Sequence, residues 1–167
     1  HGGIAALDLQ TGAEVWHARH PAFTHGSPTY IKAENLVVIG SNDGVLYAYD
    51  AKIGTLRWRY VTEGAIKTAP AYDHKRRLVL AASMDGKSYA LSAQNGTPLF
   101  ARETEAAIFS IPLVNVDTVY VGSLDKTIYA IDLDTGKDRW TYETRGRIFG
   151  APMIALDSLW IGSNDGC

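Results

Sequence analysis

Short apolar runs alternate with turn residues along the whole chain, and no run of useful length has the 3.6-residue period of an amphipathic helix. The run Leu36-Val37-Val38-Ile39 is continuously apolar, which is typical of a short strand covered on both faces. An Asn-Asp-Gly turn at 42–44 follows it, and the segment 45–49 after the turn is rich in β-forming residues. This part of the chain therefore predicts four strands, near 27–32, 35–41, 45–50 and 55–60.

The same block of strands recurs along the sequence. A turn glycine appears four times with spacings of 42, 42 and 40 residues, at Gly12, Gly54, Gly96 and Gly136. A proline series has the same spacings, at Pro28, Pro70, Pro112 and Pro152. A Ser-x-Asp turn opens four times in the same order, at Ser41, Ser83, Ser123 and Ser163. A period of about 40 residues with four strands per repeat is the signature of a β-propeller blade. The sequence therefore predicts an all-β propeller of four-stranded antiparallel blades.

The recurring residues have local structural roles. The aspartate of each repeat can cap the following turn, and the glycine supplies the positive φ that this turn needs. The tryptophan is a flat anchor that can dock on the neighbouring blade, and a small residue before the aspartate leaves room for its ring. We assign this docking motif to Asp8, Gly12, Trp16, Asp50, Gly54, Trp58, Gly96, Phe100, Asp132, Gly136 and Trp140.

The segment 121–136 carries a Gly-Ser-x-Asp turn, then Tyr-Ala-x-Asp, then Thr-Gly, with a tryptophan following at 140. This order resembles the pyrroloquinoline-quinone-type propeller repeat, in which Ala-x-Asp, Thr-Gly and Trp form a tryptophan-docking motif. The third copy departs from it, with Ser92 for Asp, Asn95 for Thr and Phe100 for Trp. We expect that interface to be the weakest of the docked ones.

The repeat register divides the chain into a half-blade at 1–18, blades at 19–60, 61–102 and 103–142, and a half-blade at 143–167. Three arrangements are compatible with this division. One chain can close on itself as a four-bladed ring, two chains can close an eight-bladed ring as a homodimer, or the chain is part of a larger propeller. Rings of this family usually resemble seven- or eight-bladed propellers, which argues against self-closure at four. Open ends would expose strand edges, which favours association.

Composition narrows the function classes. The chain has 16 Lys and Arg against 18 Asp and Glu, for a net charge of −2, so no nucleic acid partner is expected. No apolar run approaches the roughly 18 residues of a membrane span. The single cysteine, Cys167, excludes a disulfide framework within one chain, and we expect it to be an exposed free thiol.

One set of positions is a candidate ligand site at the mouth of the channel. The residue three positions before each proline of the repeated series is expected near the channel or its rim. These residues are His25, Lys67, Phe109 and Phe149. They can bind a small ligand or an anion, or they are ordinary variable lining. The aspartates of the Ser-x-Asp turns are expected to cap turns rather than to bind calcium, and His17, His20 and His25 to be rim residues rather than metal ligands. Trp160 aligns with Val38 and is expected in the core of a strand.

No catalytic constellation, phosphate loop or dinucleotide fingerprint is present in the sequence. We therefore predict a non-catalytic binding or scaffolding module that needs no cofactor and binds a protein partner at its rim loops or channel mouth. Two alternatives come from the resemblance: part of a dehydrogenase dependent on pyrroloquinoline quinone (PQQ) and calcium, or a sensor or regulatory propeller of an adenylating enzyme or kinase. The resemblance implies an adjacent Cys pair, a Trp floor, a calcium-binding Glu/Asn set and a catalytic Asp for the dehydrogenase, and none can be assigned here. It also favours a periplasmic or extracellular compartment, which the sequence itself leaves open.

Overall fold

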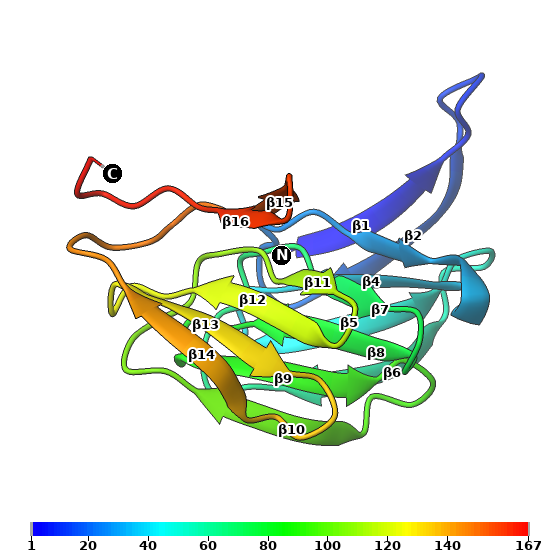
Figure 1. The fold of residues 1–167 in the computed structure, drawn as a ribbon. Helices are drawn as coiled ribbons and strands as arrows, with labels where there is room; N and C mark the ends of the chain where they lie inside the picture. The colour runs from blue at the N-terminus through cyan, green and yellow to red at the C-terminus, as the bar shows by residue number, and fades with distance from the viewer. Residues whose placement is uncertain (1, 167) are drawn as a thin grey trace.

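A computed structural model describes residues 2–166, so the expectation for the Cys167 thiol lies outside the described residues. Three four-stranded antiparallel sheets follow one another around an arc, with a two-stranded sheet at each end of the chain (Figure 1). The N-terminal half-blade consists of β1 (Gly2–Leu7) and β2 (Glu14–His20), and the C-terminal half-blade of β15 (Met153–Ala155) and β16 (Ser158–Trp160). The all-β propeller architecture predicted from the repeats is confirmed.

In each four-stranded sheet the strands lie in sequence order, the shortest one innermost. The first blade contains β3 (Thr29–Ile31), β4 (Leu36–Gly40), β5 (Val45–Asp50) and β6 (Leu56–Val61), with a short 3₁₀ turn, η1 (Lys32–Glu34), between β3 and β4. The second contains β7 (Ala71–Asp73), β8 (Leu78–Ala82), β9 (Lys87–Ser92) and β10 (Pro98–Glu103). The third contains β11 (Leu113–Asn115), β12 (Thr118–Gly122), β13 (Thr127–Asp132) and β14 (Asp138–Glu143). The inner strand β7 contacts both β3 and β11, so these three strands line the axis of the arc.

The hydrophobic core lies between blades rather than within them. One cluster joins the first and second blades, and includes Val38 and Leu46 from one side and Tyr89 and Leu91 from the other. A second cluster joins the second and third blades in the same way. Because β4 and β8 have a neighbour on both faces, their side chains are buried almost throughout, which explains their continuously apolar sequences.

The aromatic residue of each docking motif packs on the glycine of the next blade. A Cβ atom built on Gly54 would lie 2.6 Å from the Trp16 ring, and one on Gly96 would lie 2.7 Å from the Trp58 ring. Both glycines have positive φ, +69° and +73°, so they serve the turn and the close approach together. The indole Nε1 of Trp16 donates to the carbonyl oxygen of Ala51 at 3.0 Å, which fixes the ring against the turn.

The interface that uses Phe100 is built differently. Phe100 packs on Gly136, where a Cβ atom would lie 2.6 Å from the ring, but a phenyl ring has no N–H to donate. Ion pairs cross this interface, as Arg77–Glu34 crosses the one between the first and second blades. The Arg76 guanidinium reaches Asp117 at 2.6 Å and Asp134 at 2.5 Å, and Arg102 pairs with Asp138.

The two ends of the arc are uncovered. Every residue of β14 is exposed, whereas Trp58 in the equivalent strand β6 is 7% exposed. Trp160 lies in a strand, but the expectation that it is a core residue is wrong, because its side chain is 55% exposed. The equivalent Val38 is fully buried because the second blade packs on its face of the sheet, with Val79 and Ala81 in the same cluster.

Candidate functional site

Four loops that lead into the inner strands gather on one side of the arc, and we call this side the loop face; they span residues 21–28, 62–70, 104–112 and 144–152. In three of them a fully buried isoleucine anchors the loop, namely Ile66, Ile108 and Ile148. The backbone N–H of each isoleucine donates to the carbonyl oxygen of the serine that opens a Ser-x-Asp turn. Each loop is therefore held against the blade before it.

The aspartates of the Ser-x-Asp turns hold the same loops from the following blade. Asp85 accepts a hydrogen bond from the backbone N–H of Glu63 at 3.0 Å, and Asp125 accepts one from Glu105 at 2.9 Å. The other carboxylate oxygen of Asp85 accepts a hydrogen bond from the backbone N–H of Lys87, two residues along the chain, at 2.9 Å. Carboxylates engaged in this way cap turns and fasten loops, and they hold the loop face rigid.

A tyrosine hydroxyl completes each of these aspartate sites. Tyr47 donates to Asp43 at 2.9 Å and Tyr129 donates to Asp125 at 2.8 Å. Burial of the ring, reinforced by the neighbouring carboxylate, raises the pKa of both Tyr47 and Tyr129 to about 12. These phenols therefore stay protonated, and act as donors, throughout the physiological pH range.

The residue after each buried isoleucine lies at the predicted channel-mouth position. The Lys67 Nζ lies 5.7 Å from the centroid of the Phe109 ring, and that ring lies 5.8 Å from the ring of Phe149 at an interplanar angle of 49°. The structure thus brings Lys67, Phe109 and Phe149 into one row across three loops. The fourth predicted residue, His25, instead contacts Asn42, with 3.1 Å between its Nδ1 and the Asn42 Oδ1.

This row joins a cation to two aromatic faces. Lys67 and Phe109 are half-buried and Phe149 is exposed, so side chains of another protein can reach the surface of this row. An ammonium group over a ring gains a cation–π attraction and still has N–H donors for a carboxylate. The row is therefore suited to bind an apolar or aromatic side chain that lies next to an acidic one.

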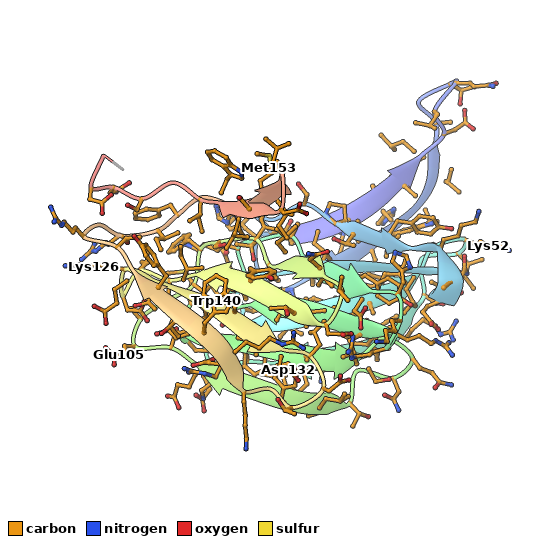
Figure 2. The ribbon with its side chains drawn as sticks, in the orientation of Figure 1. Lys52, Glu105, Lys126, Asp132, Trp140 and Met153 are labelled. Carbon is orange, nitrogen blue, oxygen red and sulfur yellow. The ribbon has the colours of Figure 1, made fainter. Side chains whose placement is uncertain are left out.

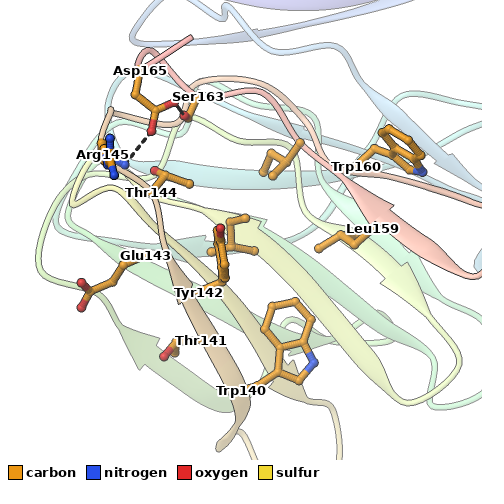
Figure 3. Close-up of a pocket in the computed structure, with 12 residues that line it drawn as sticks. Trp140, Thr141, Tyr142, Glu143, Thr144, Arg145, Leu159, Trp160, Ser163 and Asp165 are labelled. Atoms are coloured by element: carbon orange, nitrogen blue, oxygen red, sulfur yellow. Dashed lines mark hydrogen bonds between the residues drawn. The ribbon is translucent and has the colours of Figure 1, made fainter. Parts of the chain in front are cut away.

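Two features were not found from the sequence. One is the ionic network around Arg76 on the side opposite the loop face, where the β7–β8 hairpin of the second blade meets the turns of the third. The other is an apolar groove of about 860 Å³ between β14 and β16, lined by Trp140, Tyr142, Leu159 and Trp160 among others (Figure 3). The sequence signal for the groove was present, because Trp140 and Trp160 align with Trp58 and Val38, which are buried in the first blade.

Within residues 2–166, no cluster of three or more His, Cys, Asp or Glu side chains is placed to hold a metal ion. The same residues contain no helix that is long and apolar enough to cross a membrane. His17 pairs with Glu14 at 2.7 Å, and the buried His20 stacks on Tyr47 with 4.8 Å between ring centroids.

Comparison with known proteins gives a family match over nearly the whole chain. The model described as outer membrane protein assembly factor BamB matches residues 1–83 and 72–165. None of the curated proteins compared matches the chain.

Among solved structures, BamB from Moraxella catarrhalis is 23% identical with a TM-score of 0.82, and the match covers 97% of this chain and 49% of that one. The computationally designed Ika8 protein is 21% identical with a TM-score of 0.86, covering 99% of this chain and 51% of that one. The designed Ika4 protein is 21% identical with a TM-score of 0.78, covering 89% and 90%. The chain thus spans about half the length of the first two structures.

Proposed function

Because the chain belongs to the PQQ-type propeller-repeat family whose model is described as outer membrane protein assembly factor BamB, we propose that it is a non-catalytic binding and scaffolding module for a protein partner. The observation that supports a particular surface is the row of Lys67, Phe109 and Phe149 on the loop face. Rigid blades that carry variable residues on well-held loops are a common way to present a binding surface.

The chemistry of the row defines the partner segment. Phe109 and Phe149 offer apolar area at low entropic cost, and Lys67 offers a positive charge at one end of the row. A partner segment with an aromatic or aliphatic side chain next to an aspartate or glutamate satisfies both. The family description, outer membrane protein assembly factor BamB, supports looking for such a partner among proteins of outer membrane protein assembly.

Site-specific photo-crosslinking in cells tests this proposal. A photoreactive phenylalanine analogue at Phe149 is compared with the same analogue at Lys52, which lies in an exposed turn between β5 and β6, on the side opposite the loop face (Figure 2). We expect discrete protein adducts from position 149 and none of the same mass from position 52.

A charge pair of variants then separates the row from general electrostatics. Lys67→Glu and Lys52→Glu change the net charge by the same amount, so only loss of the site makes them differ. We expect Lys67→Glu to abolish the adducts at 149 and Lys52→Glu to leave them. Equal adducts from both positions, or adducts that Lys67→Glu leaves intact, would contradict the proposal.

The dehydrogenase alternative makes a different expectation. A ligand that binds only the folded state raises its stability, so PQQ with calcium would raise the thermal midpoint of an enzyme that uses them. We expect no shift, whereas a clear rise, or reduction of a dye with alcohols or sugars, would favour the enzyme.

A further inference from the structure

Exposed and covered residues alternate between positions 145 and 149 of the loop face. Arg145, Arg147 and Phe149 are exposed, whereas Ile148 between the last two is fully buried. A period of two is that of an extended segment, in which every second side chain lies on the same side. Two cations and an aromatic ring therefore follow one another along the exposed side of this loop. We call Arg145, Arg147 and Phe149 the outer stripe.

The loop that carries the outer stripe is held from both sides. The backbone N–H of Ile148 donates to the carbonyl oxygen of Ser123 in one turn, and the N–H of Asn164 in the next turn donates to the carbonyl oxygen of Arg147. The loops 62–70 and 104–112 have the same two bonds. Glu63, which occupies the position of Arg145 in its own loop, has an exposed side-chain fraction of 79%. Exposure at this position is therefore a property of the loop.

The charges of the outer stripe are specific to this loop. The position of Arg145 is a glutamate in the two equivalent loops, and the position of Arg147 is an alanine. The equivalent residues are Glu63 and Glu105 for the first position, and Ala65 and Ala107 for the second. Neither guanidinium group of the outer stripe has a hydrogen bond or an ion pair within residues 2–166, so the N–H donors of both remain available to a partner.

A third cation, Lys126, lies beside the outer stripe at a backbone position that favours glycine. Its carbonyl oxygen accepts hydrogen bonds from the N–H and the Oγ1 of Thr144, both at 2.8 Å, so it is next to the residue that precedes Arg145. Its side chain is exposed (Figure 2) and its φ is +77°. The other three Ser-x-Asp turns have glycine here, namely Gly44, Gly86 and Gly166. A side chain kept at a strained φ indicates a role for that side chain.

We propose that the outer stripe and Lys126 bind an extended acidic segment of a protein partner. In this segment two carboxylate residues are separated by one residue, and an apolar residue follows or precedes them at the same spacing. The inference rests on the proposed function and narrows the partner segment. Alternate side chains of an extended peptide lie on one side, about 7 Å apart, as those of the outer stripe do. Each guanidinium group can hold one carboxylate through two parallel hydrogen bonds.

The neighbouring groups fix where such a segment lies. Phe149 is 5.8 Å from Phe109 between ring centroids, so an apolar side chain at the end of the stripe meets two rings. Asp125 and Asp165 already accept hydrogen bonds from the backbone N–H groups of Glu105 and Arg145. The exposed carboxylate of Glu105 lies on the adjacent loop and repels an acidic segment. The acidic residues of the partner are therefore directed to the loop 144–152.

NMR titration of the isotope-labelled chain with short capped peptides is the test. The probes are Glu-Ser-Glu-Ser-Phe and its reverse sequence, which cover both chain directions. The matched controls are Glu-Glu-Ser-Ser-Phe and its reverse, which have the same composition without the spacing. We expect one spaced peptide to bind about threefold or more tightly than both controls, with shifts at the guanidinium signals of Arg145 and Arg147. The affinity should fall as salt is added.

A charge-matched pair of variants locates the binding. Arg145→Glu with Arg147→Glu and Lys52→Glu with Lys137→Glu change the net charge equally, and both lysines are exposed in turns opposite the loop face. We expect the arginine variant to weaken binding about tenfold or more and the lysine variant to bind within about twofold of the wild type. Circular dichroism confirms that both remain folded.

Lys126→Gly separates binding from stability. It restores the turn glycine, so the thermal midpoint should rise by about 2–4 °C. The same variant should bind the spaced peptide about threefold more weakly, because it lacks the third cation. A gain in stability together with a loss of binding is not expected for a lysine that serves only the fold.

Several results would overturn the inference. These are equal binding of the spaced and control peptides, no binding of any peptide, and binding that the arginine variant leaves intact. Sedimentation with phosphatidylglycerol vesicles, combined with no peptide binding, would assign the cations to a lipid surface instead. Crosslinks at position 149 that Lys67→Glu abolishes but the arginine variant retains would remove this inference and leave the proposed function. Selective peptide binding without crosslinks at 149 would do the reverse.

Discussion

The indole Nε1 of Trp58 donates a hydrogen bond to the backbone oxygen of Ala93 in the next blade, at 2.8 Å. The bond is buried, and the same ring covers Gly96. One residue therefore sets both the distance and the angle between the first and second blades. The third interface has the glycine and the ring but lacks this bond, since Phe100 replaces the tryptophan.

Trp58→Phe removes the hydrogen bond while keeping most of the packing. We expect the free energy of unfolding to fall by about 1–2 kcal/mol, because the Ala93 oxygen stays buried without its donor. Phe100→Trp should raise it by about 1 kcal/mol if the new Nε1 reaches the Leu133 oxygen, the repeat equivalent of Ala93. Urea unfolding curves measure both changes. Equal stability of Trp58→Phe and the wild type would contradict this account of docking.

Gly96→Ala and Gly12→Ala form a matched pair. Both glycines have nearly the same φ, +73° and +71°, so the backbone cost of about 1 kcal/mol or more is common to the two variants. A Cβ at Gly96 would lie 2.7 Å from Trp58, while one at Gly12 would meet nothing within 4 Å. We therefore expect Gly96→Ala to lower the free energy of unfolding by at least about 1 kcal/mol more than Gly12→Ala does. Thermal unfolding compares them, and equal losses would mean that the close approach contributes nothing.

The fold was predictable because its information is repeated. Each strand pair, turn and docking ring occurs several times in one register, so a strand signal such as the apolar segment 36–39 can be checked against the other copies. The prediction failed at Trp160, where the alignment was right but the burial was wrong. Burial depends on whether another blade packs on the face of the sheet that carries the residue. The repeat register does not say whether such a blade is present.

The candidate site was predictable in part for the same reason. Alignment placed Lys67, Phe109 and Phe149 at equivalent positions, and their contacts follow from the neighbouring loops. The Arg76 network could not be found in this way, because Arg76, Asp117 and Asp134 do not recur together and their side chains join across two blades. Such ion pairs depend on side-chain reach, which repeat spacing does not describe.

Asp117 should contribute to the acid sensitivity of the protein. Hydrogen bonds from Lys75 and Arg76 lower the pKa of its carboxyl group to about 2 in the folded state, against about 3.9 in the unfolded chain. The stabilising contribution is therefore fully present above about pH 4 and is lost as the pH falls through 2. In Asp117→Asn this part of the pH dependence disappears.

The measurement is the free energy of unfolding at several values between about pH 2 and pH 6. The difference in the free energy of unfolding between wild type and Asp117→Asn should become smaller as the pH falls. Glu105→Gln is the control, since that exposed side chain has no hydrogen bond or ion pair among residues 2–166. If this difference stayed constant over the whole pH range, the ionisation of Asp117 would not contribute to stability, which would contradict the prediction.

Arg76 links the second and third blades more strongly than an ordinary surface ion pair. Its side chain is largely buried and its guanidinium reaches Asp73 in its own hairpin as well as Asp117 and Asp134 of the third blade. Arg76→Met should lower the free energy of unfolding by about 1–2 kcal/mol, because Asp73 is itself buried and loses its partner. Arg76→Lys should recover only part of the lost stability, since an ammonium group cannot bridge several carboxylates as the planar guanidinium group does.

Arg57→Met is the matched control, because Arg57 makes a single 3.2 Å contact with Asp50 and is half exposed. That variant should cost less than about 1 kcal/mol, and added salt should remove most of the cost. The cost of Arg76→Met should persist in salt, since the Arg76 and Asp73 side chains are largely buried, with exposed fractions of 12% and 5%. If salt abolished the Arg76 effect as fully as the Arg57 effect, the network would be a solvated surface cluster, and the phenylalanine interface would need another source of stability.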